Sequence, residues 1–171
     1  MASVKAYAQL ITSREGGTTL YYNVLSESEV EVTYPEGELT TYSGAITIPE
    51  SITYFGKQLS VTRIGEDAFR DCIGLTSITI PGSVKSVGSW AFRGCTGLEK
   101  VIVKDLAAYC GIDFDFGSSP FIGNEAYLYS DENTKITDLV IPNGVTRIGD
   151  GVFNCYQHLK SVTIPNSVTS I

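Results

Sequence analysis

The sequence is poor in the residues from which catalytic and metal sites are usually built. It has one histidine, His158, and four cysteines without any Cys-x-x-Cys pair. A zinc site and a Ser-His or Cys-His catalytic arrangement both need more partners than these. No G-x-x-x-x-G-K-[ST] phosphate-binding loop is present either. We therefore predict no enzyme activity, no catalytic residue, no metal and no cofactor.

The chain also lacks long apolar runs and an excess of basic residues. No run of 18 apolar residues occurs, so we expect no membrane insertion, and the N-terminal segment lacks the hydrophobic region of a signal peptide. The net charge is −7, and charged residues make up only 18% of the chain. This charge repels nucleic acid and anionic membrane surfaces, so neither is an expected partner.

What the sequence does contain is a repeat with a period of 23 residues. The same residue types return in register, and a period of this length indicates a solenoid. One position holds Val61, Val84, Val145 and Val168, a second holds Ile64, Val87, Ile148 and Ile171, and a third holds Phe69, Phe92 and Phe153. One repeat cannot bury its apolar side alone, so stacked copies are expected to share a continuous core.

Each repeat contains three short motifs with separate structural meanings. The alternating L-x-x-I-x-I-P motif predicts a half-buried strand that ends at the proline. In V-x-x-I-G, the glycine is expected to adopt a positive φ at a turn. The A-F-x-x-C motif is expected to form one helical turn. Stacked repeats hold their side chains parallel, so Cys72, Cys95, Cys110 and Cys155 are expected to be reduced thiols.

The phrases "LTSITIPGSVKSVGSWAFRGC" and "LKSVTIPNSVTSI" resemble the BspA-like leucine-rich repeats of bacterial and protist surface proteins. The resemblance covers roughly residues 45–171. It implies a mostly β leucine-rich-repeat solenoid with short helical turns, curved as a right-handed superhelix. It also implies an extracellular or cell-surface location, a role in adhesion, and a protein partner of host or matrix type. The family has no active site whose residues could be carried over.

Two regions flank the regular repeats. Residues 1–60 are expected to form an N-terminal β cap with a first irregular rung, because an end repeat needs a cover. Within them, "LYYNVLSESEVEVTYPEGEL" predicts a β-hairpin. Residues 61–171 are expected to form the array. The sequence stops in the middle of the repeated phrase, so we expect an array truncated mid-repeat, with an open last edge and possible self-association.

A segment at about 104–135, here called the island, is expected to interrupt the array. It is rich in aromatic and acidic residues, which either fill an enlarged core or form a ligand patch. Its candidate contact residues are Phe114, Phe116, Tyr127, Tyr129, Asp113 and Asp115. The two aspartates could also bind calcium, but the ligand count of an EF-hand is missing. A glycan-binding module should leave at least two of the six island aromatics exposed beside a groove, and a passive spacer should leave none.

The repeat also predicts two rows of outward side chains. One row follows the I-x-I strands and includes Ser77, Thr79, Lys100 and Ile102. A second row contains the basic candidates Arg63, Lys85 and Arg147, which could meet an acidic partner. The alternative is ordinary solvated β-surface, because repeats produce such rows automatically. The prediction from sequence is a non-catalytic recognition scaffold that binds a protein ligand, with a glycan-binding module and a surface spacer as alternatives.

Overall fold

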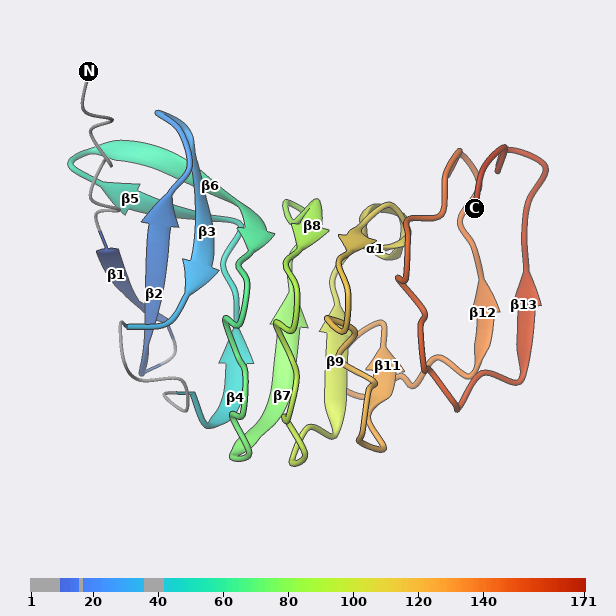
Figure 1. The fold of residues 1–171 in the computed structure, drawn as a ribbon. Helices are drawn as coiled ribbons and strands as arrows, with labels where there is room; N and C mark the ends of the chain where they lie inside the picture. The colour runs from blue at the N-terminus through green and yellow to red at the C-terminus, as the bar shows by residue number, and fades with distance from the viewer. Residues whose placement is uncertain (1–9, 16, 36–41) are drawn as a thin grey trace, which may run out of the picture.

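The computed structural model describes residues 10–15, 17–35 and 42–171, and these form a β-solenoid with an antiparallel β-structure at its N-terminal end (Figure 1). The predicted mostly β solenoid is confirmed. Each regular coil contributes one strand to each of two parallel ladders, and a tight turn joins the two. Side chains from both ladders meet in one continuous core.

The N-terminal structure consists of antiparallel strands that continue into the first ladder. Strand β1 (Leu10–Glu15) pairs with β2 (Thr18–Val24), and β2 pairs with β3 (Glu29–Thr33), which confirms the predicted hairpin. Strand β3 then runs parallel to β6 (Lys57–Ile64), and β5 (Ser51–Tyr54) forms a second hairpin with β6. The array therefore begins on a sheet edge that β1–β3 already cover.

The second ladder is a four-stranded parallel sheet that runs along the solenoid. Its strands are β4 (Gly44–Thr47), β7 (Leu75–Ile80), β9 (Lys100–Val103) and β11 (Tyr127–Tyr129), in the spatial order β11-β9-β7-β4 (Figure 1). These are the predicted L-x-x-I-x-I strands. Their alternation places isoleucine, leucine and valine inward and leaves an opposite row facing outward.

The island contains a complete coil, which corrects the prediction that it interrupts the array. Helix α1 (Leu106–Cys110) opens this coil, and the Asp105 carboxylate caps it by accepting a hydrogen bond from the Ala108 N–H at 3.0 Å. Strand β10 (Asp113–Phe114) then pairs with β8 (Ser86–Val87) in the first ladder, and β11 pairs with β9 in the second. The extra residues hid this register in the sequence because they shift the period.

Beyond β11 the chain makes a tight hairpin before the last coils. The Ser130 N–H donates to the Thr134 carbonyl at 3.0 Å, and Tyr129 bridges to Lys135 in antiparallel fashion. We call residues 130–135 the island hairpin. Strands β12 (Asp138–Val140) and β13 (Ser161–Thr163) follow as a separate parallel pair at the C-terminal end (Figure 1).

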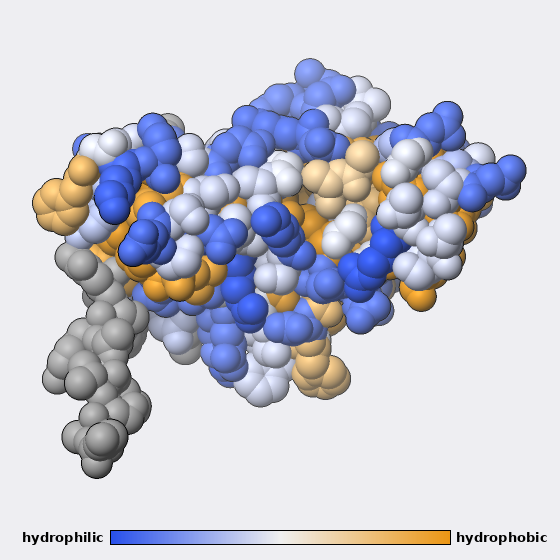
Figure 2. Space-filling view, turned by 90° about the horizontal axis from the view of Figure 1, so that it is seen from above, coloured by the Kyte–Doolittle hydropathy of each residue, from blue (hydrophilic) through white to orange (hydrophobic). Residues whose placement is uncertain are grey.

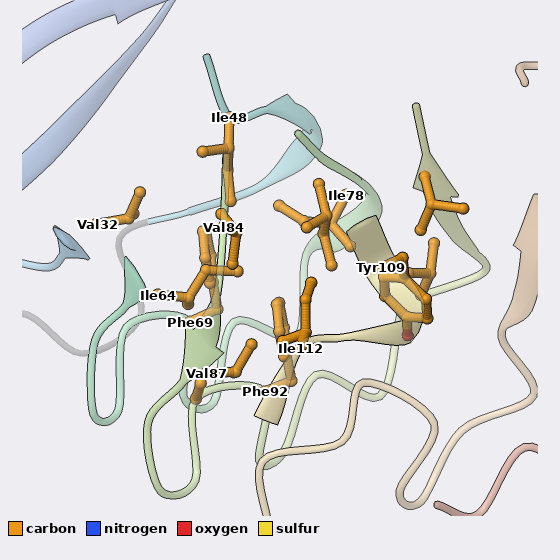
Figure 3. Packing of buried hydrophobic residues seen from close by; sticks show 14 of the residues in the cluster. Val32, Ile48, Ile64, Phe69, Ile78, Val84, Val87, Phe92, Tyr109 and Ile112 are labelled. Carbon is orange, nitrogen blue, oxygen red and sulfur yellow. The ribbon is translucent and has the colours of Figure 1, made fainter. Parts of the chain in front are cut away.

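The core is built from rows of equivalent side chains in successive coils. Phe69 and Phe92 stack with ring centroids 5.2 Å apart and planes within 1° of parallel, and Tyr42 extends the row at 4.9 Å from Phe69. Figure 3 shows these phenylalanines pointing into the same interior as Ile64 and Val87. Because a 23-residue period places like residues in contact, each row extends through neighbouring coils.

The glycines of V-x-x-I-G have a different role from the predicted one. Neither Gly88 nor Gly149 has a positive φ, so the prediction of a left-handed turn at this position is wrong. Instead, neighbouring backbone fills the space that a side chain would need. A Cβ on Gly88 would lie 2.6 Å from the Glu66 nitrogen, and one on Gly149 would lie 2.0 Å from the Ile112 carbonyl oxygen. These positions need glycine because adjacent coils approach closely.

The left-handed residue stands two positions later in the turn. In the coils with the V-x-x-[IV]-G motif it is Asp67 (φ 56°), Trp90 (φ 57°) or Gly151 (φ 67°). In the island coil the same position is held by Gly117, with φ of 67°. Aspartate and glycine tolerate this conformation, whereas a bulky aromatic residue rarely adopts it. Trp90 is therefore an exception within a row of suitable residues.

The A-F-x-x-C stretches form successive hydrogen-bonded turns instead of a helical turn. In the first copy, the Arg70 N–H donates to Asp67 and the Cys72 N–H to Phe69, at 2.9 and 3.1 Å. The left-handed residue before Ala68 prevents these turns from joining into a helix. Among the described helices none is long and apolar enough to cross a membrane.

The last coil exposes residues that lie in the core elsewhere. Val162, Ile164 and Ile171 are exposed, whereas Val168 of the same coil is partly buried against the core. Among the described strands, β13 pairs with β12 alone, so its other edge is open. The expected self-association at this edge stays a prediction.

Candidate functional site

The predicted basic row and the two island aspartates meet on the first ladder. Arg63 lies 3.4 Å from both Glu31 and Asp115, and it thereby links β3, β6 and the turn after β10. Arg147 contacts Asp113 at 2.5 Å. Partners that stand 34 and 52 positions apart in the sequence are paired in this way because the ladder places successive coils side by side.

These pairings engage the two arginines of the basic row. Lys85, the remaining basic candidate, lies 4.0 Å from Glu29. Hydrogen bonds from the Arg147 guanidinium and from the Asp150 N–H hold the pKa of Asp113 below its ordinary value. The view from above shows hydrophilic residues over much of the surface and hydrophobic residues in separate smaller areas (Figure 2). Within the row, the Arg63 and Arg147 charges are paired, and the Lys85 ammonium is the one that stays largely open to an acidic partner.

The same pairings bear on the suggested calcium site. Asp113 and Asp115 each contact an arginine, so their carboxylates are already engaged. Within residues 10–15, 17–35 and 42–171, no group of three His, Cys, Asp or Glu side chains is placed to hold a metal ion. These residues have the chemistry of an ion-pair row between coils.

Packing accounts for most of the island aromatics. Phe114 and Tyr129 are only 7% and 6% exposed, which removes both from the candidate contact residues. Tyr109 and Phe121 are buried as well, because the island coil has its own share of the core. Of the six island aromatics, Phe116 alone is largely exposed, at 81%.

Tyr127 is half-buried inside a stack of side chains. The His158 ring lies 3.6 Å from it, within 8° of parallel, and the Lys135 ammonium lies 3.6 Å from the tyrosine ring centroid. His158 also contacts the Glu125 carboxylate at 3.7 Å. The stack joins the island to the last coils and leaves the tyrosine ring little free face for a sugar. The glycan-binding alternative required two exposed aromatics, so the structure does not favour it.

The outward row of the second ladder lies along a groove in which Thr47 is exposed, whereas Thr79, Ile102 and Tyr129 are only 5–6% exposed. Strand register aligns Thr47, Thr79, Ile102 and Tyr129 across four neighbouring strands. At the end of this row, Ser130, Asp131 and Glu132 of the island hairpin rise beside Lys104 and form one wall of a groove of about 300 Å³. We call it the row groove; Thr47, Thr79 and Ile102 form its floor.

The island hairpin is held firmly beside the row groove. The Asp131 carboxylate accepts hydrogen bonds from the N–H groups of Asn133 and Thr134, which lower its pKa. The Lys100 ammonium donates to the Glu132 carbonyl at 3.3 Å and lies over the Tyr129 ring. The groove thus has a preformed wall with hydroxyl, carboxylate and ammonium groups beside an apolar floor residue.

Sequence reasoning missed two exposed or half-exposed aromatics in left-handed conformations. Phe55 stands at the tip of the β5–β6 hairpin with φ of 46° and is 87% exposed. Trp90 occupies the left-handed turn position described above. The pattern "YFGK" between two alternating segments was an available hairpin signal for Phe55. No comparable signal marked Trp90, because the V-x-x-I-G motif predicted the positive φ at its glycine and not two positions later.

Comparison with known proteins supports the architecture. A family model described as the BspA type leucine-rich repeat region matches residues 44–112 and 121–171, in six copies. A leucine-rich cell surface protein from Faecalibacterium prausnitzii A2-165 is 25% identical, with a TM-score of 0.54, over 93% of this chain and 44% of that one. A leucine-rich repeat protein from Bacteroides capillosus ATCC 29799 has the same identity and TM-score, over 91% of this chain and 99% of that one. No curated protein matches the chain. The chain thus spans less than half the length of the first of these structures.

Proposed function

The chain belongs to the BspA-type leucine-rich repeat family, and on that premise we propose that it is a non-catalytic recognition scaffold that binds a protein ligand at a cell surface. The observation that carries this proposal is the row groove. Four strands place their outward side chains in one line, and the island hairpin walls that line on one side.

The composition of the row groove suits a segment of protein. Its floor combines threonine hydroxyls with the apolar Ile102, and its rim carries the Lys104 ammonium and the Asp131 and Glu132 carboxylates. Protein segments present amides, charges and apolar side chains together, so they can satisfy such a mixed lining. A glycan reader would need open aromatic faces, and the described island aromatics are mostly buried.

A cell-surface location is supported only by similarity to known proteins. The similar protein from Faecalibacterium prausnitzii is described as a cell surface protein. We extend that location to this chain as part of the proposal. A broad hydrolase screen should give no turnover that depends on a single residue of the chain.

The test is binding of purified matrix proteins, such as collagen, fibronectin, laminin and fibrinogen, to the immobilised chain. Thr47→Trp fills the open end of the row groove with a bulky ring, and Thr163→Trp places the same ring at an exposed position of β13 as a matched control. We expect a bound protein to lose about tenfold or more in affinity with Thr47→Trp, which is about 1.4 kcal/mol. Equal loss with both variants, or binding to glycans that Thr47→Trp abolishes, would contradict the proposal.

A further inference from the structure

Trp90 is held by a set of neighbours that fit its ring. The Arg70 and Arg93 guanidinium groups lie over the indole, 5.8 and 5.7 Å from its centroid. These arginines stand at equivalent positions of successive coils. A Cβ on Gly117, in the next coil, would lie 2.7 Å from the indole Cδ1, so only glycine leaves room for the ring there.

The backbone at Trp90 is unfavourable for its side chain. A left-handed φ costs an L-residue roughly 1–2 kcal/mol, and the equivalent turns use aspartate or glycine instead. The ring also stays partly exposed, so the free energy gained by burying it offsets only part of the backbone strain. Strained residues persist where the side chain has a use, and such an outlier is a basis for inferring function.

The charges around Trp90 are unevenly paired. Arg70 is engaged by Asp67 at 3.2 Å and by Asp71 at 3.4 Å. Arg93 is exposed and has no carboxylate within 4.0 Å among the described residues. A guanidinium therefore remains available beside the indole, on a chain whose net charge is −7.

Phe116 is an exposed apolar residue in the coil next to Trp90. The Trp90 N–H donates to the Phe116 carbonyl at 3.1 Å, so the two residues are neighbours in adjacent coils. No described ring stacks on Phe116, and its side chain projects into solvent. Tryptophan, arginine and exposed aromatics are the residues in which interface binding energy concentrates.

We propose that Trp90, Arg93 and Phe116 form a docking surface for a protein segment that presents a carboxylate beside an apolar side chain. Arg93 binds the carboxylate, and Phe116 together with the indole edge contacts the apolar group. The two guanidinium groups over the indole occupy the ring where a sugar would stack, which favours a peptide segment over a glycan. This surface lies on the turns between the ladders and does not depend on the row groove.

The chain has a single tryptophan, so its fluorescence reports on this surface alone. The first measurement is collisional quenching by iodide, caesium and acrylamide at constant ionic strength. Iodide should quench Trp90 more strongly than caesium does, despite the net negative charge of the chain. Arg93→Gln should remove about half of the iodide quenching and leave acrylamide quenching unchanged. Lys57→Gln, on the β5–β6 hairpin, removes the same charge and should change neither.

The second measurement is titration with a capped tetrapeptide that alternates glutamate and leucine, against the same peptide with glutamine. We expect a saturable change in Trp90 emission with the glutamate peptide alone. Arg93→Gln should abolish this change, and Phe116→Ala should weaken it without affecting folding, because the ring is exposed. Stronger quenching by caesium, no saturable binding, or equal response to both peptides would overturn the proposal. Such results would leave the row groove untouched, since Thr47→Trp tests that surface separately.

Discussion

Replacing Gly88 by alanine sets two known effects against each other. Where the backbone conformation is ordinary, Gly→Ala stabilises a protein by about 0.4–1 kcal/mol through the unfolded chain. Gly88 has such a conformation, but its new methyl group would lie 2.6 Å from the Glu66 nitrogen and 2.9 Å from the Gly65 carbonyl carbon. Both obstacles are backbone atoms, which cannot rotate away as a side chain could. The two coils must therefore separate locally.

The steric effect should win. Overpacking of this kind costs roughly 1–3 kcal/mol, which exceeds the entropic gain. We expect Gly88→Ala to lower the free energy of unfolding by about 1–2 kcal/mol, and each kcal/mol corresponds to about 2–4 °C in Tm for a chain of this size. Urea unfolding followed by circular dichroism measures the change.

An asparagine series separates close approach from a positive φ. Asparagine tolerates the left-handed conformation better than alanine, but it is larger. At Gly88, Asn should therefore be as harmful as Ala or worse. At Gly123, which has φ of 75° and no atom within 4 Å of the place that a methyl group would take, Asn should be milder than Ala. If Gly88→Asn proves more stable than Gly88→Ala, the close-approach argument is wrong.

Three further perturbations test the core, the hairpin tip and the buried acids. Phe69→Ala breaks the Tyr42–Phe69–Phe92 row and should cost about 3–5 kcal/mol in urea unfolding; a cost under about 1 kcal/mol would refute the role of this row. Phe55→Asn should hold or raise Tm, because Asn suits a φ of 46° and the lost ring is exposed, whereas a clear fall in Tm would show that the ring packs. Burial raises the pKa of Cys95 from 9.0 to about 12 and that of Tyr22 from 10.0 to about 12, so their stabilising effect is complete below pH 9 and is lost as pH rises toward 12. The last part of the rise in tyrosinate absorbance should accordingly coincide with loss of the circular dichroism signal, and full ionisation near pH 10 with intact structure would contradict this.

The solenoid could be predicted from the sequence because its pattern is local and repeated. Alternating Ile78 and Ile80 before Pro81 predicts a strand by itself, and the same phrase 23 residues later predicts a neighbour for it. The family resemblance rests on the same repeated residues. The hairpin around Ser26–Ser28 was also readable, since the turn residues and the alternating flanks lie within one short segment.

The tertiary structure decided which candidate residues remain available for a partner. Arg63 and Asp115 are 52 residues apart, and only the stacking of coils brings them into one ion pair. Phe114 and Phe116 look equivalent in sequence, yet β10 pairing turns the first inward while the turn after it leaves the second in solvent. At Gly88, the sequence showed that a glycine was needed, but the reason lies in the backbone of the adjacent coil. A repeat pattern specifies what each coil contains, whereas contacts between coils depend on how their backbones stack in three dimensions.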